Sequence, residues 1–338
     1  MEAVAINAAA FILTLAVFGG FVALFGVDPL AVYHALYLGA FATRISIETT
    51  LTQAAPLMLT ALCTAIPARA GLLVIGGEGA LVVGGVATVL VGVHLGGVPP
   101  AFGVLLLGIS GALAGGLWIG AAGVLREYRG VNETIATLLM NYIAIALMNH
   151  LVSGPIRDFS EVLKPASWSI PAALMVGSIP GMDVHWGLVV GVGACLALFV
   201  VTRSTTFGFG LDVLGGNPRA AQMVGLSTHR LAVAACFIGG AGAGLAGAME
   251  IIAVHGFASV SLAVGFGYAG ILIAFLARHN PIAIIFVAVL VGGISASGGL
   301  LQRRFGLPDA TSTVLHGMLF MAVLASNTLY GRFRVFRR

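Results

Sequence analysis

The scarcity of charge is the feature that most restricts what this chain can fold into. Its 338 residues contain 16 Lys and Arg and 12 Asp and Glu, so charged residues make up 8% of the chain, whereas soluble domains carry about 25%. A soluble fold of this length needs far more polar surface to cover its core. The basic residues are also scattered, and the net charge of +4 does not form the basic face that nucleic acids require. The sequence therefore excludes a soluble enzyme, a disordered chain and a nucleic-acid-binding domain, and it predicts an all-α polytopic membrane protein.

Long apolar segments predict about ten transmembrane helices. A spanning helix needs about 20 mostly apolar residues, and the 48 glycines would allow such helices to pack closely. The second and eighth segments are short, and Pro67 is expected to end the second helix. The predicted spans are 3–25, 51–66, 72–94, 101–125, 133–152, 186–202, 231–253, 262–278, 281–299 and 310–329.

The distribution of Lys and Arg predicts that both termini are cytoplasmic. In that orientation eleven basic residues fall in inner loops and five in outer loops, as the positive-inside rule requires. The C-terminal segment GRFRVFRR supplies four of the eleven. Arg303 and Arg304 are an exception, because they fall on the outer side.

The chain is interpreted as a single transmembrane domain over 1–338. It has an outer loop at 153–185 and a long cytoplasmic loop at 203–230. Ten spans divide into two halves of five, and an odd number per half inverts the second half, as in many transporters. A glycine-rich break occurs in each half, at 76–79 and at 265–270.

The cytoplasmic loop contains a short helix with end signals. Asn217 suits the N-cap position and Pro218 the first helical position, while Gly225 suits the position after the helix end. A helix over 218–224 is too short to be stable alone, so a partner protein or the membrane spans must hold it. The residues leave two interpretations open: a docking helix for a cytoplasmic protein, or an ordinary interfacial helix.

Glu78 is an acid within an apolar segment and is flanked by Gly76, Gly77 and Gly79. Placing a carboxylate at the centre of a membrane helix costs about 2.5–3.5 kcal/mol. The glycines indicate an interrupted helix, whose backbone N–H groups could satisfy the acid or a ligand. Glu78 is then either a residue of the transport pathway, accepting hydrogen bonds from sugar or base groups, or a structural cap of the broken helix.

Two other polar positions lie within predicted spans. Asn141, in the fifth span, could line the pathway or hydrogen-bond a neighbouring helix. Glu250 lies near the outer end of the seventh span, close in sequence to His255. This pair could line the outer mouth of a pathway or extend into water.

Enzymatic and metal-binding patterns are absent from the sequence. It has no phosphate loop, no HExxH and no GxSxG pattern, and its cysteines, Cys63, Cys195 and Cys236, lack metal-ligand spacing. We therefore expect no catalytic residue, no metal and no cofactor. A self-contained secondary transporter or channel for a small polar solute is the alternative to an ATP-driven importer, but no chain of acids for ion coupling is present.

Several short motifs in a fixed order carry a resemblance to a known family. From about residue 45 to 328 the chain resembles the permease subunit of nucleoside and simple-sugar ATP-binding-cassette (ABC) importers, in the group that includes ribose and branched-chain amino acid permeases. It departs from the family pattern at Leu73 and Val74, where FN is usual, and at Ala269, where Asp is frequent. The motifs are RAGLLVIGGEG (69–79), GVNETIATLLMNYIA (130–144), RSTTFGFGLDVLGGNPRAAQMVGLS (203–227), GAMEIIAVHG (247–256), LARHNP (276–281) and LQRRFGLP (301–308).

The resemblance implies a multi-pass protein of the cell membrane that imports nucleosides or related simple sugars. It also implies separate partners: a second permease subunit in a heterodimer, cytoplasmic ABC ATPases and an extracytoplasmic substrate-binding protein. The family's coupling helix, which enters a cleft on the ATPase, matches the segment GGNPRAAQMVG. The positions that this match assigns to ATPase coupling are Asn217, Pro218, Arg219, Ala220 and Ala221.

Overall fold

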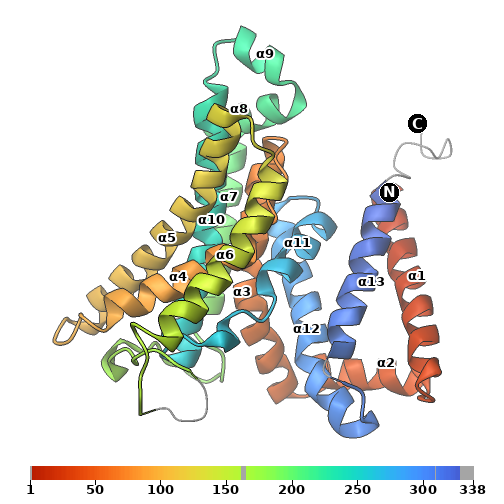
Figure 1. Ribbon diagram of the computed structural model, residues 1–338. Coiled ribbons are helices and arrows are strands. Elements are labelled where there is room, and N and C mark those ends of the chain that lie inside the picture. Colours follow the sequence, from red (N-terminus) through yellow and green to blue (C-terminus); the bar gives the residue numbers. More distant parts are fainter. Residues whose placement is uncertain (1, 161–164, 309, 328–338) are drawn as a thin grey trace. The chain divides into compact units, whose positions relative to one another are not determined.

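The computed structural model describes residues 2–160, 165–308 and 310–327. These residues form helices and contain no named β-strand, only isolated β-bridges such as that between Arg157 and Ser167. The all-α prediction is therefore confirmed (Figure 1). Lys164 and the basic residues of the tail 331–338, which entered the orientation argument, lie outside the described residues.

The chain divides into two compact units. The smaller unit contains residues 1–54 and 289–338, and the larger one contains residues 55–288. Two long helices, α3 (Arg44–Arg69) and α12 (Pro281–Phe305), contribute to both. The other helices of the smaller unit are α1 (Glu2–Leu24), α2 (Pro29–Tyr37), the π-helix η1 (Leu38–Ala42) and α13 (Ala310–Asn327). Those of the larger unit are α4 (Gly77–Gly92), α5 (Pro100–Arg129), α6 (Glu133–Ser153), η2 (Ala172–Leu174), α7 (Gly187–Ser204), α8 (Thr206–Gly216), α9 (Pro218–Met223), α10 (Thr228–Glu250), η3 (Ile251–His255), η4 (Val260–Leu262) and α11 (Phe266–Leu276).

A sharp bend shapes the smaller unit. The segments Ala10–Leu24 and Pro29–Ala42 meet at 117°. Asp28 caps the second segment by accepting the N–H of Leu30 at 3.0 Å, and Pro29 takes the first helical position. This cap pattern is present in the sequence, but only a single span at 3–25 was predicted here, with no second helix. The core of the unit comprises Phe18, Val22, Val32, Ala35, Leu301, Leu307 and Leu315.

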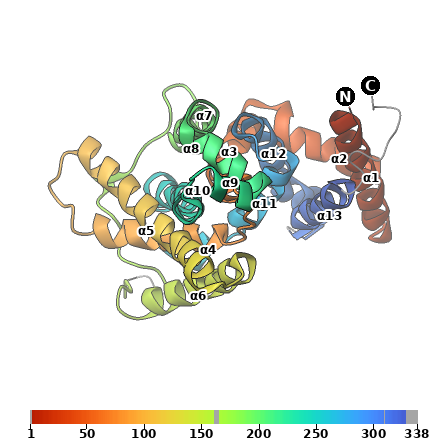
Figure 2. The ribbon, with the colours of Figure 1, turned by 90° about the horizontal axis from the view of Figure 1, so that it is seen from above.

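A glycine seam holds the larger unit together. Helix α10 packs against α4 and α5 (Figure 2). A Cβ on Gly115 of α5 would lie 2.6 Å from the carbonyl oxygen of Gly240 on α10, and a Cβ on Gly244 would lie 2.9 Å from Cα of Gly115. No side chain fits at such a distance, so glycine lets the two backbones touch. The close packing that the abundance of glycine predicted is therefore present between these helices.

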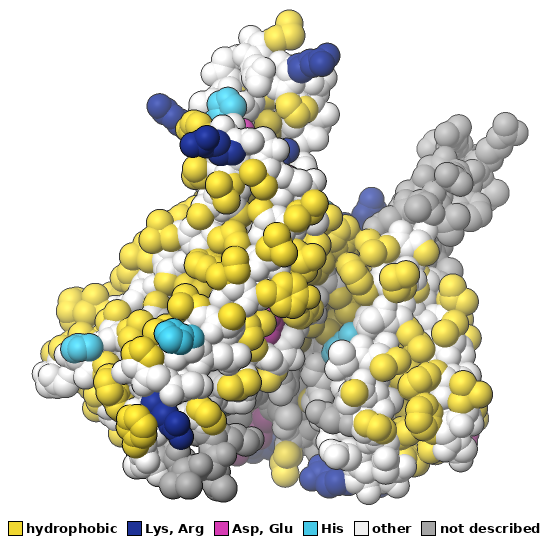
Figure 3. Space-filling model, viewed as in Figure 1, with side chains coloured by type: hydrophobic (Ala, Val, Ile, Leu, Met, Phe, Trp, Pro, Cys, Tyr) yellow, Lys and Arg dark blue, Asp and Glu magenta, His cyan; other side chains and the backbone are white. Residues whose placement is uncertain are grey.

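Within the described part of the chain, six helices are long and apolar enough to cross a membrane, and the bent pair in the smaller unit would make a seventh. The six are Arg44–Arg69, Pro100–Arg129, Glu133–Ser153, Gly187–Ser204, Thr228–His255 and Pro281–Phe305. The remaining predicted spans contain the shorter apolar helices Gly77–Gly92, Val260–Leu276 and Ala310–Ser326. On the larger unit, Figure 3 shows hydrophobic side chains along the exposed sides of α5 and α6, as expected of a surface that contacts lipid.

Helix α3 is longer than the sequence analysis predicted. It continues through Pro56 and Pro67 to Arg69, whereas Pro67 was expected to break the chain. A Cβ on Gly239 of α10 would lie 3.1 Å from Cδ of Pro67 and 2.9 Å from the carbonyl oxygen of Cys63. The glycine therefore leaves room for the ring, and a neighbouring helix can accommodate a proline in a membrane helix in this way.

Candidate functional site

The segment between α3 and α4 is not helical, and side chains of α6 bind its backbone. Glu133 accepts the N–H of Leu73 at 3.3 Å, and Thr134 donates to the Leu73 carbonyl at 2.9 Å. One turn further on, Thr137 accepts the N–H of Ile75 at 3.1 Å. Glu133 and Thr134 lie four and three positions before Thr137, so both are within reach of its helix face. Side chains of α6 thus satisfy part of the backbone of this segment.

Asn141 continues this polar face of α6. Its Oδ1 accepts the N–H of Gly79 at 2.7 Å, and its Nδ2 donates to the Ile75 carbonyl at 3.0 Å. The side chain is fully buried. Asn141 therefore bridges the end of the irregular segment and the first turn of α4, which is the neighbouring-helix contact that the sequence left open as one interpretation.

Glu78 lies in the first turn of α4 and is 1% exposed. Its Oε1 accepts the N–H of Gly265 at 2.8 Å, and its Oε2 accepts the N–H of Gly267 at 2.6 Å. Both donors belong to the start of α11, so the carboxylate caps that helix from 187 residues away. A negative charge is stabilised at a helix N-terminus by the free N–H groups and the helix dipole.

The two glycine-rich breaks seen in the sequence meet at this point. Helices α4 and α11 both begin here, and a Cβ on Gly77 would lie 3.5 Å from Cα of Gly267. Gly76 is as closely packed, since a Cβ there would lie 2.9 Å from Cβ of Thr137. We call this region the polar junction; it comprises Thr60, Glu78, Thr137, Asn141, Gly265 and Gly267.

Sequence analysis missed several members of the polar junction and its edge. Thr60 of α3, which was not predicted, donates to the Phe266 carbonyl at 3.0 Å. Thr137 lies in the motif GVNETIATLLMNYIA (130–144), but no role was predicted for it. Tyr268, which is 41% exposed, interacts with Asn141. The spacing of Glu133, Thr134, Thr137 and Asn141 along one helix face was the signal that could have identified the α6 contribution.

Glu250 lies apart from these hydrogen bonds. It ends α10 and is buried, and its Oε2 lies 3.8 Å from Nε2 of His255. The five residues from Ile251 to His255 form the π-helix η3. The structure therefore places Glu250 beside His255, as the sequence suggested, and among the described residues no hydrogen bond joins it to Glu78.

The short helix of the 203–230 loop is present as Pro218–Met223, within one residue of the prediction. Oδ1 of Asn217 accepts the N–H groups of Arg219 and Ala220 at 3.0 and 3.2 Å. Pro218 and Arg219 are exposed and Ala220 is half-buried.

Packing against the larger unit holds this helix in place. Ala221 is fully buried in a core cluster that includes Leu211 and Leu214. At the C-terminal end of the helix, Met223 is 87% exposed, and Val224, the residue that follows the helix, is also exposed. The helix α9 thus carries an apolar tip at one end of the larger unit (Figure 1). Exposed apolar groups on a helix so placed are typical of a docking surface.

A second helix in the same loop was not predicted. Helix α8 covers Thr206–Gly216, and Thr205 caps it through the N–H of Gly208 at 3.4 Å. Its glycines suggested turns, but Gly208 and Gly215 lie so close to the carbonyls of Thr202 and Arg69 that a Cβ at either position would clash. The glycines of α8 allow close packing. The sequence alone cannot distinguish this role of glycine from its role in a turn.

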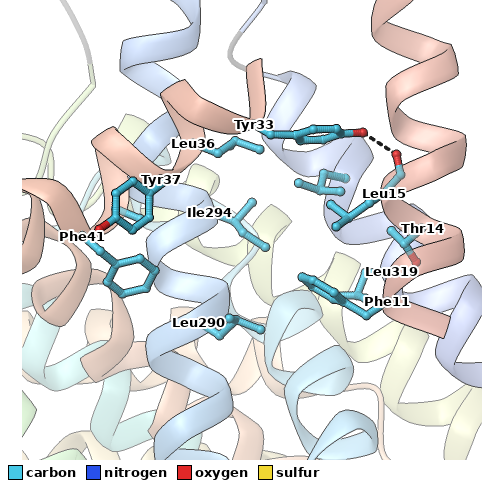
Figure 4. Close-up of a pocket in the computed structure, with 12 residues that line it drawn as sticks. Phe11, Thr14, Leu15, Tyr33, Leu36, Tyr37, Phe41, Leu290, Ile294 and Leu319 are labelled. Atoms are coloured by element: carbon cyan, nitrogen blue, oxygen red, sulfur yellow. Dashed lines mark hydrogen bonds between the residues drawn. The ribbon is translucent and has the colours of Figure 1, made fainter. Parts of the chain in front are cut away.

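The smaller unit contains an apolar pocket of about 250 Å³ among α1, α2, η1, α12 and α13 (Figure 4). Its lining is almost entirely apolar. Two of its hydroxyls already donate to backbone: that of Tyr33 to the Leu15 carbonyl, and that of Thr14 to the Ala10 carbonyl at 2.8 Å. This pocket is not part of the candidate site.

Residues 46–324 match the family described as branched-chain amino acid transport system / permease component. The chain belongs to this family. As a family member it is a permease subunit of an ABC importer, a multi-pass protein of the plasma membrane and not an enzyme. Family membership also decides against the alternative of a self-contained secondary transporter or channel.

Three relatives are similar over most of their length. The permease is 31% identical over 332 residues to a glucose ABC transporter permease of Haloferax volcanii, covering 95% of this chain and 87% of the relative. It is 32% identical over 300 residues to a guanosine ABC transporter permease of Bacillus subtilis, covering 87% and 85% respectively. A nucleoside ABC transporter permease of Lactococcus lactis is 27% identical over 306 residues, covering 88% and 84%.

Proposed function

We propose that this permease imports nucleosides or related simple sugars as one of two different permease subunits. Cytoplasmic ABC ATPases drive the cycle, and an extracytoplasmic binding protein delivers the substrate. The observation that carries the proposal is the similarity of this chain to relatives named for glucose and for guanosine. Both are polyhydroxylated solutes, and a ribose or hexose presents the hydroxyl groups that a buried acceptor recognises.

The proposed topology has ten spans in two inverted halves, with both termini in the cytoplasm. The basic-residue distribution and the meeting of α4 and α11 at their N-termini support it, because paired interrupted helices in the two halves are a mark of inverted-repeat transporters. A cysteine introduced at position 160 should react with an impermeant thiol reagent in intact cells. One at position 217 should react only after the membrane is opened. The reverse pattern would reject this orientation.

The proposed pathway runs past the polar junction, with Glu78, Gly76, Gly77 and Asn141 at its wall and Glu250 further toward the outer side. Glu78 and Asn141 are the buried polar groups that hold the two helix starts together. A solute hydroxyl that binds there competes with the backbone N–H groups of α11. Binding would therefore loosen the contact between α4 and α11, which is a route to alternating access.

The proposed coupling element is α9 with its N-cap, Asn217 to Ala221. Ala221 anchors the helix to the permease, while Arg219 and the apolar tip face outward. Closure of the ATPases would push this helix, and the push would reach α10 through the core cluster that contains Ala221, Ala232 and Ala235.

Uptake into proteoliposomes tests the proposal. The permease is reconstituted with its ATPases, its second permease subunit and its binding protein, and uptake of labelled guanosine, glucose and leucine is compared with and without ATP. The proposal expects ATP-dependent uptake of guanosine or glucose. ATP-dependent uptake of leucine alone would reject the substrate class but leave the permease assignment in place.

A further inference from the structure

The larger unit contains a pocket that is separate from the apolar pocket of the smaller unit. Its lining residues differ in kind from those of the polar junction. It encloses about 570 Å³ between the ends of α3, α7 and α11, the start of α12 and one side of α8. Three arginines line it: Arg69, Arg203 and Arg278. Asp212 is the acid among its lining residues. We call it the basic pocket.

The arginines of the basic pocket carry more charge than the acid neutralises. Arg69 pairs with Asp212 in a bidentate contact, at 2.9 and 2.7 Å. The exposed Arg203 lies over the ring of Phe199, 5.7 Å from its centroid, and no carboxylate among the described residues pairs with it. Burial and, to a smaller extent, Arg278 hold the pKa of His279 below its ordinary value, so this imidazole is neutral at pH 7. The pocket therefore has an excess of positive charge.

An unusual turn places Arg278 at the basic pocket. Arg278 and His279 both have positive φ, at 52° and 58°, and they are the described residues other than glycine that do. Such a conformation is sparsely populated for residues with a side chain. Two hydrogen bonds hold this conformation. The N–H of Arg278 donates to the Phe275 carbonyl at 3.0 Å, and the N–H of His279 donates to the Ala274 carbonyl at 2.8 Å. Backbone strain of this kind clusters at functional sites.

This turn is the LARHNP motif, which the coupling and pathway proposals leave without a role. Arginines near helix C-termini can also stabilise the helix dipole, and Arg69 and Arg203 do lie in last turns. The hydrogen bonds of the turn form a helix C-cap, which accounts for its left-handed backbone. They give no role to the guanidinium group of Arg278, which the turn places at the pocket together with Arg69 and Arg203.

We propose that the basic pocket binds the phosphate of an anionic phospholipid headgroup. Guanidinium groups bind phosphate through paired hydrogen bonds, and basic pockets between the ends of membrane helices bind acidic headgroups. Phe209, which is 64% exposed, and Phe199 flank the pocket. These rings offer an apolar wall to the acyl chains, a contact that inorganic phosphate or an acidic side chain of a soluble partner would leave unused.

Native mass spectrometry of the full-length permease tests the proposal. The purified protein is titrated with phosphatidylglycerol and, separately, with phosphatidylcholine of the same acyl chains. The test variant is Arg203→Gln with Arg278→Gln, which keeps hydrogen-bonding capacity but removes the charges and leaves the Arg69–Asp212 pair intact. Arg129→Gln is the matched control, because Arg129 is also an exposed arginine at a helix C-terminus but lies outside the pocket. Equal melting temperatures establish that all three proteins are folded.

The proposal expects one tightly held phosphatidylglycerol whose affinity falls by about tenfold or more in the double variant and is unchanged in Arg129→Gln. Equal binding of the two lipids, or equal loss in both variants, would overturn it. Saturable binding of inorganic phosphate that the double variant abolishes, without preference for phosphatidylglycerol, would assign the pocket to a soluble anion instead. Loss of ATPase co-purification with unchanged lipid binding would assign it to the protein partner.

Discussion

Polar side chains that accept backbone N–H groups cap both α9 and α11 of the larger unit, but these two caps differ in origin. Asn217 caps α9 from the adjacent position, through residues two and three positions further along. Glu78 caps α11 from the first turn of another helix, through residues 187 and 189 positions away. The first cap is exposed and the second is buried.

The difference has a consequence for the mechanism. Loss of the Asn217 cap frees donors that water can satisfy at once, so its effect stays within α9. Loss of the Glu78 carboxylate leaves two backbone N–H groups without their acceptor in a buried site, and it also separates α4 from α11. A remote cap thus joins two helices that must move in a transport cycle, whereas a local cap defines one helix.

Substitutions at the apolar tip of α9, the proposed coupling helix, should have the largest effect on function. Replacing both Met223 and Val224 with Asp should abolish ATPase co-purification and substrate-stimulated ATP hydrolysis, because the charges would replace the apolar tip. Arg219→Glu should weaken both. The control is Met182→Asp, the same kind of change in the predicted outer loop, which should alter neither. Normal co-purification of the double variant would remove α9 from the docking surface.

Glu78 should have the next largest effect. A lost charge-assisted hydrogen bond costs about 1.5–3 kcal/mol, so Glu78→Leu should lower transport by about tenfold or more. Glu78→Gln retains one acceptor oxygen and should keep part of the activity. The measurement is transport per folded molecule, with monodisperse detergent-extracted protein as the denominator. Normal specific transport by Glu78→Leu, with a reduced yield of folded protein, would leave Glu78 as a structural cap only.

Substitution of Asn141 tests whether the hydrogen bonds made by α6 contribute to the stability of the permease. Asn141→Leu leaves the N–H of Gly79 and the carbonyl of Ile75 unpaired, and it should destabilise the permease by about 1–3 kcal/mol. Asn149, on the same helix, has an Oδ1 that is buried without a hydrogen-bond partner among the described residues. Asn149→Leu should therefore cost little. Thermal unfolding of the two variants in detergent makes the comparison, and equal destabilisation would contradict it.

The Asn217 cap should have the smallest effect. Asn217→Ala removes a cap worth about 1 kcal/mol, and Asn217→Asp keeps it. Hydrogen exchange should accelerate in residues 218–224 of the alanine variant only, while the melting temperature of the whole protein stays the same. A global loss of stability would show that this cap, like that of Glu78, supports more than its own helix.

Sequence alone located the short coupling helix because its signals are local. Asn217, Pro218 and Gly225 lie within nine positions and act on the helix that they bound. The same reasoning could have found α2 from Asp28 and Pro29. It failed for α8, because glycines that pack against a neighbouring carbonyl look like glycines in turns, and for α3, because the space around Pro67 is provided by a glycine on a different helix.

What the sequence determined by itself was the membrane class, most of the long helical segments and the residues whose burial needs a partner. The solvent dictates these: a chain with so few charges must place its apolar segments in lipid, and a helix must satisfy its backbone within the segment. Which partner Glu78 and Asn141 find was decided only by the tertiary structure, since their hydrogen bonds join positions 62 to 189 residues apart. Likewise, three arginines far apart in the chain form one pocket only because the ends of α3, α7 and α11 converge. A local sequence pattern cannot specify these contacts between distant positions, because they depend on how closely the glycine-lined helices pack against one another.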